Sequence, residues 1–172
     1  MLGRIGFFTG LTWAGSFLLA MLSLKQPVWG FAGNILGVLT IWIAGWQIRA
    51  WQEQEKIRFG IRHRWHICLA SHLLAALICT FTQYIYLRYL DNGQMMTALT
   101  NLYSNPEYAS LMSENIKDYD PSLVISTLQN MTLGQLTMEF LILNSFIALV
   151  LSLPTMLVAK TRDKQPHNMQ QK

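Results

Sequence analysis

Residues Trp65–Tyr89 read WHICLASHLLAALICTFTQYIYLRY, and the rest of the chain is arranged around them. From Trp65 to Leu87 there is no Asp, Glu, Lys or Arg over 23 residues. At a rise of about 1.5 Å per residue, a helix of this length crosses a bilayer core of roughly 30 Å. A basic segment precedes the stretch and an acidic segment follows it. The pattern therefore predicts a membrane-spanning helix whose two ends lie in different surroundings.

The composition supports a membrane protein, because only 13% of the 172 residues are charged, whereas soluble domains average about 25%. The deficit is concentrated in four apolar runs. We therefore predict an all-α polytopic membrane protein that forms one four-helix domain over residues 1–172. The predicted spans are about 5–24, 28–48, 65–88 and 133–159. The net charge of +4 does not indicate nucleic-acid binding, because the basic residues lie at the ends of the runs, where membrane topology explains them.

The first apolar run follows a basic residue, Arg4. A cleaved signal peptide begins in a similar way, so this alternative has to be considered. The hydrophobic region of a signal peptide is only about 7–15 residues long, whereas this run extends from Ile5 to Leu24. No small-residue cleavage site follows it before Lys25. We therefore expect a retained membrane helix.

Small residues recur at helical spacing in the first two runs, with Gly6 and Gly10 in one run and Gly33 and Gly37 in the other. Stripes of this kind let helix backbones approach closely in membranes. We expect a tight hairpin with the two glycine faces packed together. The alternative is that glycine is simply common in membrane helices. Asn34 is polar within the second span, and we expect it to bond across the hairpin or to a carbonyl.

The connector between the second and third spans is basic, and the one between the third and fourth is acidic. By the positive-inside rule the basic side is cytoplasmic. Counting the amino terminus, the basic connector and the 160–172 tail together gives ten basic residues, against three on the other side. Both termini are therefore expected in the cytoplasm. We expect the basic connector to contact lipid head groups or, alternatively, to dock a partner; its basic residues are Arg49, Lys56, Arg58, Arg62 and Arg64.

The acidic connector, residues 91–132, is predicted to form two or three short amphipathic helices over the outer mouth of the bundle. Two helix starts are marked by a capping residue followed by proline, at Asn105-Pro106 and at Asp120-Pro121. Apolar residues then recur at helical spacing. The connector should therefore be ordered rather than a free loop.

Two ionisable residues fall within predicted spans, and such residues are functional candidates by default. His72 lies near the cytoplasmic end of its span and Glu139 near the outer end of the fourth. The structural alternatives are a neutral imidazole bonded across the bundle and a carboxylate paired with Lys25 or Arg88. A proton relay between the two would need intermediates such as Asn34, Asn144, Thr80 or water.

Metal ligands are sparse in the sequence. His63 and His66 could share a helix face, and so could Cys68 and His72, but no second pair completes a site for either. No phosphate-binding loop and no nucleophile–base arrangement are recognisable. We expect no metal, no cofactor and no catalytic residue.

The chain resembles a bacterial family of four-span membrane proteins known as domain of unknown function 4199. The resemblance is carried by the glycine-rich first hairpin, Ile48-Arg49-Ala50-Trp51, Phe59-Gly60, Tyr84-Ile85-Tyr86-Leu87-Arg88-Tyr89-Leu90-Asp91, the long connector rich in Met, Glu and Asn, and the basic end Lys160-Thr161-Arg162. Phe59-Gly60-Ile61 departs from the more polar pattern of the family. The resemblance implies a bacterial inner membrane with a periplasmic 91–132 connector. It brings no catalytic residues and suggests lipid-linked glycosyltransferases as neighbours.

Two functions are compatible with these features. The first is a non-enzymatic accessory or scaffold subunit of a membrane enzyme complex. It is suggested by the small-residue helix faces and by the ordered outer cap. The second is a small oligomeric transporter or lipid-handling protein that uses the polar residues inside the bundle. Four spans rarely enclose a path, so this second function requires self-association. An enzyme ranks third. Expected partners are membrane lipids together with a membrane protein or a second copy, and no nucleic acid.

Overall fold

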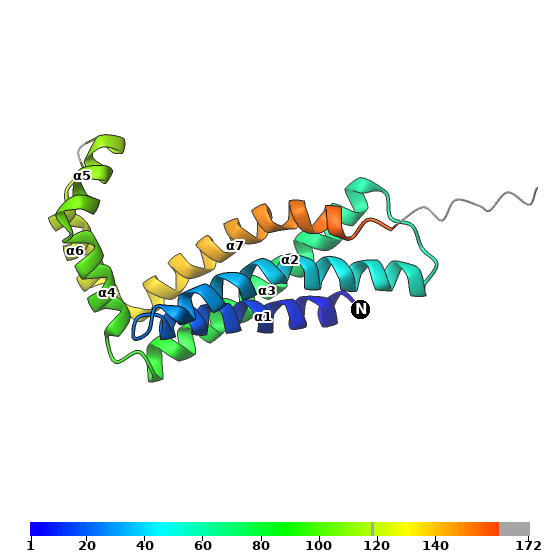
Figure 1. The fold of residues 1–172 in the computed structure, drawn as a ribbon, viewed down its shortest axis with the longest axis horizontal. Helices are drawn as coiled ribbons and strands as arrows, with labels where there is room; N and C mark the ends of the chain where they lie inside the picture. Colours follow the sequence, from blue (N-terminus) through cyan, green and yellow to red (C-terminus); the bar gives the residue numbers. More distant parts are fainter. Residues whose placement is uncertain (118, 162–172) are drawn as a thin grey trace, which may run out of the picture.

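The computed structural model describes residues 1–117 and 119–161, and over these residues all regular secondary structure is helical. Four helices are long and apolar enough to cross a membrane, which confirms the predicted fold class. The helices, in chain order, are α1 (Leu2–Leu22), α2 (Val28–Gln54), α3 (Ile61–Tyr89), α4 (Gln94–Tyr103), α5 (Pro106–Asn115), α6 (Pro121–Asn130) and α7 (Leu133–Val158) (Figure 1).

Helix α3 is the centre of the bundle, because it packs along both α1 and α7. Helix α2 packs against α1 and α7 and has few contacts with α3, so the four long helices form a ring. The buried apolar positions are mostly small, including Ala75, Ala76 and Cys79 on α3. Large side chains such as Phe31 and Trp42 point outward instead. Small residues inside and large residues outside are the arrangement expected when lipid is the solvent.

The helices that contain the second and third predicted spans are longer than the spans themselves. Helix α2 continues past Ile48 to Gln54, and α3 begins at Ile61 rather than Trp65. The basic connector is therefore only six residues long, and Lys56 takes a positive φ of 53° within it. A charged residue marks where the hydrocarbon ends, but it is compatible with a helix, so helices run on into the polar layer. For the same reason α1 starts at Leu2, before Arg4.

The three short helices α4–α6, called the cap below, show that the acidic connector folds into short helices as predicted. A turn with positive φ at Asn92 and Gly93 separates the cap from α3. The Asn105 side chain accepts from the Glu107 N–H, and the Asp120 side chain accepts from the Ser122 N–H, so both predicted helix starts are capped. Hydrogen bonds from the hydroxyl and then the backbone N–H of Ser122 hold the pKa of the Asp120 carboxyl below its usual value.

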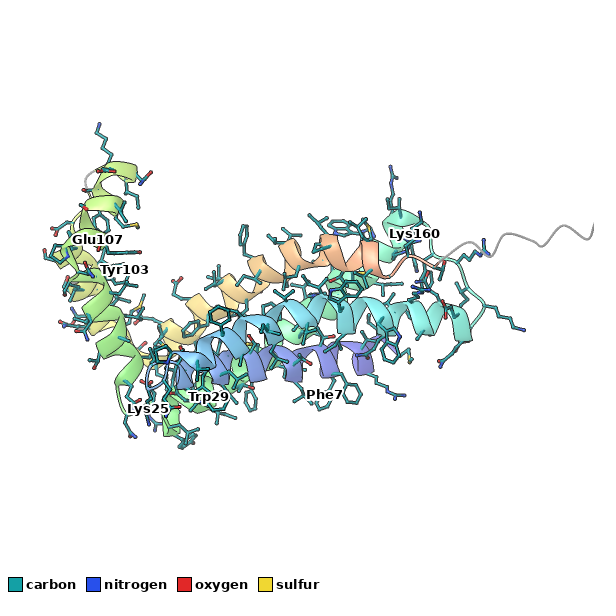
Figure 2. All side chains as sticks on the ribbon, in the orientation of Figure 1. Phe7, Lys25, Trp29, Tyr103, Glu107 and Lys160 are labelled. Carbon is teal, nitrogen blue, oxygen red and sulfur yellow. The ribbon has the colours of Figure 1, made fainter. Side chains whose placement is uncertain are left out.

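The cap lies across one end of the long bundle and projects to one side, past α7 (Figure 1). Lys25 and Trp29 lie at this cap end, whereas Lys160 lies at the opposite end, called the basic end below (Figure 2). The amino terminus is also at the basic end. The predicted grouping of the chain's start, the basic connector and Lys160 on one side is thus confirmed. Residues 162–172 of the tail lie outside the described residues.

Candidate functional site

The polar side chains inside the bundle gather between α3 and α7, and we call this contact the polar seam. Its ionisable residue is His72, one of the two functional candidates from the sequence, and this side chain is fully buried. The imidazole Nδ1 lies 2.9 Å from the Cys68 carbonyl oxygen and Nε2 lies 3.3 Å from the Thr155 hydroxyl of α7. A carbonyl can only accept, so Nδ1 carries the ring proton and Nε2 is left as an acceptor. The structure therefore brings a hydroxyl of α7 within hydrogen-bond reach of His72, as the cross-bundle alternative for His72 requires.

The Thr155 hydroxyl has two acceptors within reach. It lies 2.8 Å from the Leu151 carbonyl oxygen, one turn earlier on α7, as well as beside the His72 ring. A hydroxyl has one proton, so in a given state it donates to only one of them. Because the Thr155 hydroxyl can donate to either acceptor, the His72–Thr155 contact can form or open while the hydroxyl stays hydrogen-bonded.

A second part of the seam is centred on Asn144 of α7. Its amide nitrogen donates to the Thr80 hydroxyl and to the Gln83 side-chain oxygen, each at 2.8 Å. All three side chains are buried. Both N–H donors of the Asn144 amide are therefore used by α3, which satisfies polar groups that would be costly if left unpaired in hydrocarbon.

Near the basic end, two further bonds secure α7. The Trp65 indole N–H donates to the Ser152 hydroxyl at 3.0 Å. The buried Gln52 side chain of α2 donates to the Ala159 carbonyl at 2.8 Å. That carbonyl follows the last turn of α7 and has no helical partner, so Gln52 supplies the missing hydrogen bond. These contacts tie α2 and α3 to the last turns of α7.

The hydrogen bonds of the polar seam serve to hold neighbouring helices together. Each polar side chain of the seam has a partner on the neighbouring helix or on its own backbone. Within residues 1–117 and 119–161 there is no group of three His, Cys, Asp or Glu side chains that could hold a metal ion. Cys68 and Cys79 are free thiols buried in α3.

Glu139 does not form the predicted ion pair with Lys25 or Arg88. It is exposed at the cap end of α7, and no ion pair joins it to Lys25 or Arg88 within the described residues. Glu139 lines a shallow groove between α6 and α7 whose other walls are Ser126, Thr127, Asn130, Met131 and Gln135. Thr155, the partner of His72, is 16 positions from Glu139, or about 24 Å along α7. The two ionisable candidates therefore do not act on each other directly.

The prediction for Asn34 was also wrong. This residue is exposed on α2, and its side-chain amide makes no hydrogen bond within the described part of the chain. Its polarity within the span led to the expected bond, but polarity does not fix direction: Gly33 faces α1, whereas a helix turns by about 100° per residue, so the next residue faces elsewhere.

The glycine faces are used inside the bundle, but they do not meet each other as predicted. A Cβ placed on Gly6 would lie 2.7 Å from Leu74 of α3, so this face packs on α3. A Cβ on Gly33 would lie 3.0 Å from the Ser16 carbonyl oxygen of α1. Gly10 likewise faces α3, and Gly37 faces α1. Both stripes are therefore occupied by the chain's own helices.

The basic residues assigned to lipid head groups differ in their surroundings. Lys56, Arg58 and Arg62 are exposed at the basic end. Arg49 is bound to Glu53 at 3.1 Å. Arg64 is half-buried and donates to the Phe59 carbonyl at 3.0 Å, so part of its guanidinium stabilises the connector itself.

Sequence reasoning missed Gly45, Gln52 and most of the seam. A Cβ on Gly45 would lie 2.6 Å from Val158, so this glycine sets the contact between α2 and α7. A signal for the seam is present in the sequence as polar residues at spacings of eight and three, at His72, Thr80 and Gln83 on α3 and at Asn144, Ser152 and Thr155 on α7. Such spacing places each set on one face of its helix.

A comparison with protein families finds a match over residues 4–161 to a family described as protein of unknown function (DUF4199). No curated protein matches the chain. No solved structure matches it. The match extends from the first turn of α1 to beyond the end of α7, and so includes every helix of the bundle and the cap. The chain therefore belongs to the DUF4199 family.

Proposed function

We propose that the protein is a non-enzymatic accessory or scaffold subunit of a membrane enzyme complex. The observation that carries this proposal is the cap, which projects beyond the bundle past α7 (Figure 1). The cap presents large apolar side chains that the bundle does not cover, with Leu111 at 55% and Leu123 at 64% exposure. Apolar side chains exposed on a projecting polar surface are typical of protein-binding sites.

The polar seam supports the same function. His72 and Asn144 have partners on the facing helices, so their side chains are accounted for by the bundle's own stability. The small-residue stripes are occupied in the same way, which moves the expected docking surface from the glycines to the cap. We place the cap in the periplasm of a bacterial inner membrane, with both termini in the cytoplasm, because the basic residues gather at the opposite end. The family resemblance makes enzymes of lipid-linked sugars the first partners to test.

The test is extraction of the tagged protein into lipid nanodiscs, followed by mass spectrometry of the proteins that co-purify. We expect one membrane enzyme at near-stoichiometric amount. The paired change Leu111→Ser and Leu123→Ser should lower its recovery at least tenfold, because both side chains are exposed and their removal leaves the bundle intact. Leu90→Ser is the matched control, because Leu90 is also an exposed leucine. It directly follows α3 at the cap end of the bundle and is not part of the cap.

An eluate without any stoichiometric membrane protein would contradict the accessory function. Equal recovery of the partner by the cap variant and by Leu90→Ser would instead remove the cap as its docking surface. The thermal unfolding midpoint of each variant shows that loss of the partner is not loss of the fold.

A small oligomeric transporter or lipid-handling protein is the second candidate. It is favoured by one observation, the run of polar side chains along the seam from Ser152 to Asn144. Transport through this seam would require its hydrogen bonds to open. Unchanged uptake or lipid flipping in His72→Ala and Glu139→Gln variants, measured in vesicles, would exclude this function.

A further inference from the structure

One polar side chain in the membrane-spanning helices stands apart from the seam, and it is Asn34 on α2. Asn144 uses both amide N–H groups across the bundle. Asn115 and Asn130, which are exposed on cap helices, each donate to the carbonyl four residues earlier. Within the part of the chain that the structure describes, the Asn34 amide has neither kind of bond.

Asn34 lies inside the charge-free second span rather than at its end. It lies six residues after Val28, the first residue of α2, or about 9 Å along the helix from the cap end. An asparagine side chain has only two rotatable bonds and is far shorter than the Lys and Arg side chains that extend to the membrane surface. Its surroundings are apolar, with Phe31 at 77% and Val38 at 60% exposure on adjacent turns. The amide is therefore held among lipid chains, where an unpaired polar group is costly.

We propose that Asn34 pairs with Asn34 of a second copy of this chain, and that the outward face of α2 forms a two-fold homodimer contact in the membrane. An amide has both a donor and an acceptor, so two copies can exchange two hydrogen bonds. Every copy inserts with the same orientation, so a two-fold axis along the membrane normal brings both Asn34 residues to the same depth. An unrelated partner would need a polar group at that depth by coincidence, whereas a second copy has one necessarily.

The surface around Asn34 is compatible with such a contact. Phe31, Ile35, Val38 and Trp42 lie on the same side of α2 and are all exposed. None of them is needed inside the bundle, because α2 packs against α1 through Gly33 and Gly37 and against α7 through Gly45. Polar side chains of this kind are known to hold membrane helices together when their alternative is hydrocarbon. This pairing does not depend on the proposed accessory function.

The first test is oxidative cross-linking of Ile35→Cys, an exposed neighbour that leaves Asn34 in place, in membranes at low protein-to-lipid ratio. The native Cys68 and Cys79 are buried and provide a silent background. Phe81→Cys is the matched control, because Phe81 is exposed on α3 eight residues from the cap end of that helix, at a similar depth. We expect the Ile35→Cys dimer to form at least five times faster than the Phe81→Cys dimer.

The second test measures the dimer dissociation constant in bilayers by energy transfer between labelled copies. We expect Asn34→Leu to weaken the dimer about tenfold, the change that two interhelical hydrogen bonds of ordinary strength produce, and Asn34→Gln to retain most of the affinity. A wild-type protein that stays monomeric at every ratio would overturn the proposal. Equal cross-linking at the two positions, equal affinity of wild type and Asn34→Leu, or cross-linking of Ile35→Cys mainly to another protein would overturn it as well.

Discussion

Replacing Gly45 with alanine is expected to lower the free energy of unfolding by about 2–3 kcal/mol, at the upper end of the range for overpacked interiors. The added Cβ would lie 2.6 Å from the Cβ of Val158 and 3.2 Å from the Thr155 carbonyl oxygen. Val158 is β-branched, so its side chain cannot rotate the clashing atom away. The Cβ atom is fixed by the backbone, so α2 and α7 must separate. That separation would also stretch the Gln52–Ala159 hydrogen bond.

The measurement is reversible unfolding in mixed detergent micelles, followed by circular dichroism. Gly3→Ala is the matched control, because a Cβ on Gly3 meets nothing within 4 Å. Its effect should be within about 0.5 kcal/mol of zero. A double variant, Gly45→Ala with Val158→Gly, should be less destabilised than the sum of its two single changes, because Val158→Gly removes the atoms with which the added Cβ clashes. Equal losses at Gly45 and Gly3 would show that the close contact does not limit stability.

The number of spans and the helices of the cap could be predicted because they depend on local signals. A charge-free run of about 20 residues has few alternatives to a membrane helix. The caps at Asn105 and Asp120 act within two residues of themselves, so their bonds to Glu107 and Ser122 follow from the local sequence. Features of this kind need no knowledge of which helix is adjacent.

The pairing of helix faces could not be predicted, because a membrane helix is apolar all around. In a soluble helix the polar face identifies the solvent side, but here Phe31 and Ala44 are both apolar, although one is exposed and the other buried. The spacing of Gly6 and Gly10 shows that they share a face, but it does not say whether α2 or α3 covers that face. The structure assigns Gly6 to α3 and Gly33 to α1. Asn34 was misplaced for the same reason, because polarity alone does not determine direction in lipid.

The candidate site was predicted in part. His72 and Asn144 were identified because a polar side chain in a span needs a partner. Their partners Thr155 and Gln83 lie on helices separated by more than 60 residues of sequence, and only the packing of α3 on α7 reveals them. The sequence thus indicates which residues need a bond, whereas the fold decides which residues provide it.

Substituting alanine for His72 is expected to destabilise the protein by about 2–4 kcal/mol, because a fully buried ring leaves a cavity and loses its bond to α7. Leu73→Ala is the matched control on the same turn, since Leu73 points outward and is exposed. Its loss should stay below about 1 kcal/mol. The same unfolding assay applies to both variants.

A double-mutant cycle then isolates the hydrogen bond from the cavity. His72→Phe keeps most of the ring volume, and Thr155→Val keeps the shape of threonine while removing its hydroxyl. If the Nε2 contact stabilises the seam, the two changes should be coupled by about 0.5–1.5 kcal/mol, the range measured for hydrogen bonds between membrane helices. Additive losses would mean that Thr155 donates to the Leu151 carbonyl and leaves Nε2 unpaired. In that case His72 would present a free ring nitrogen inside the bundle, and the transport function would gain the proton acceptor that it requires.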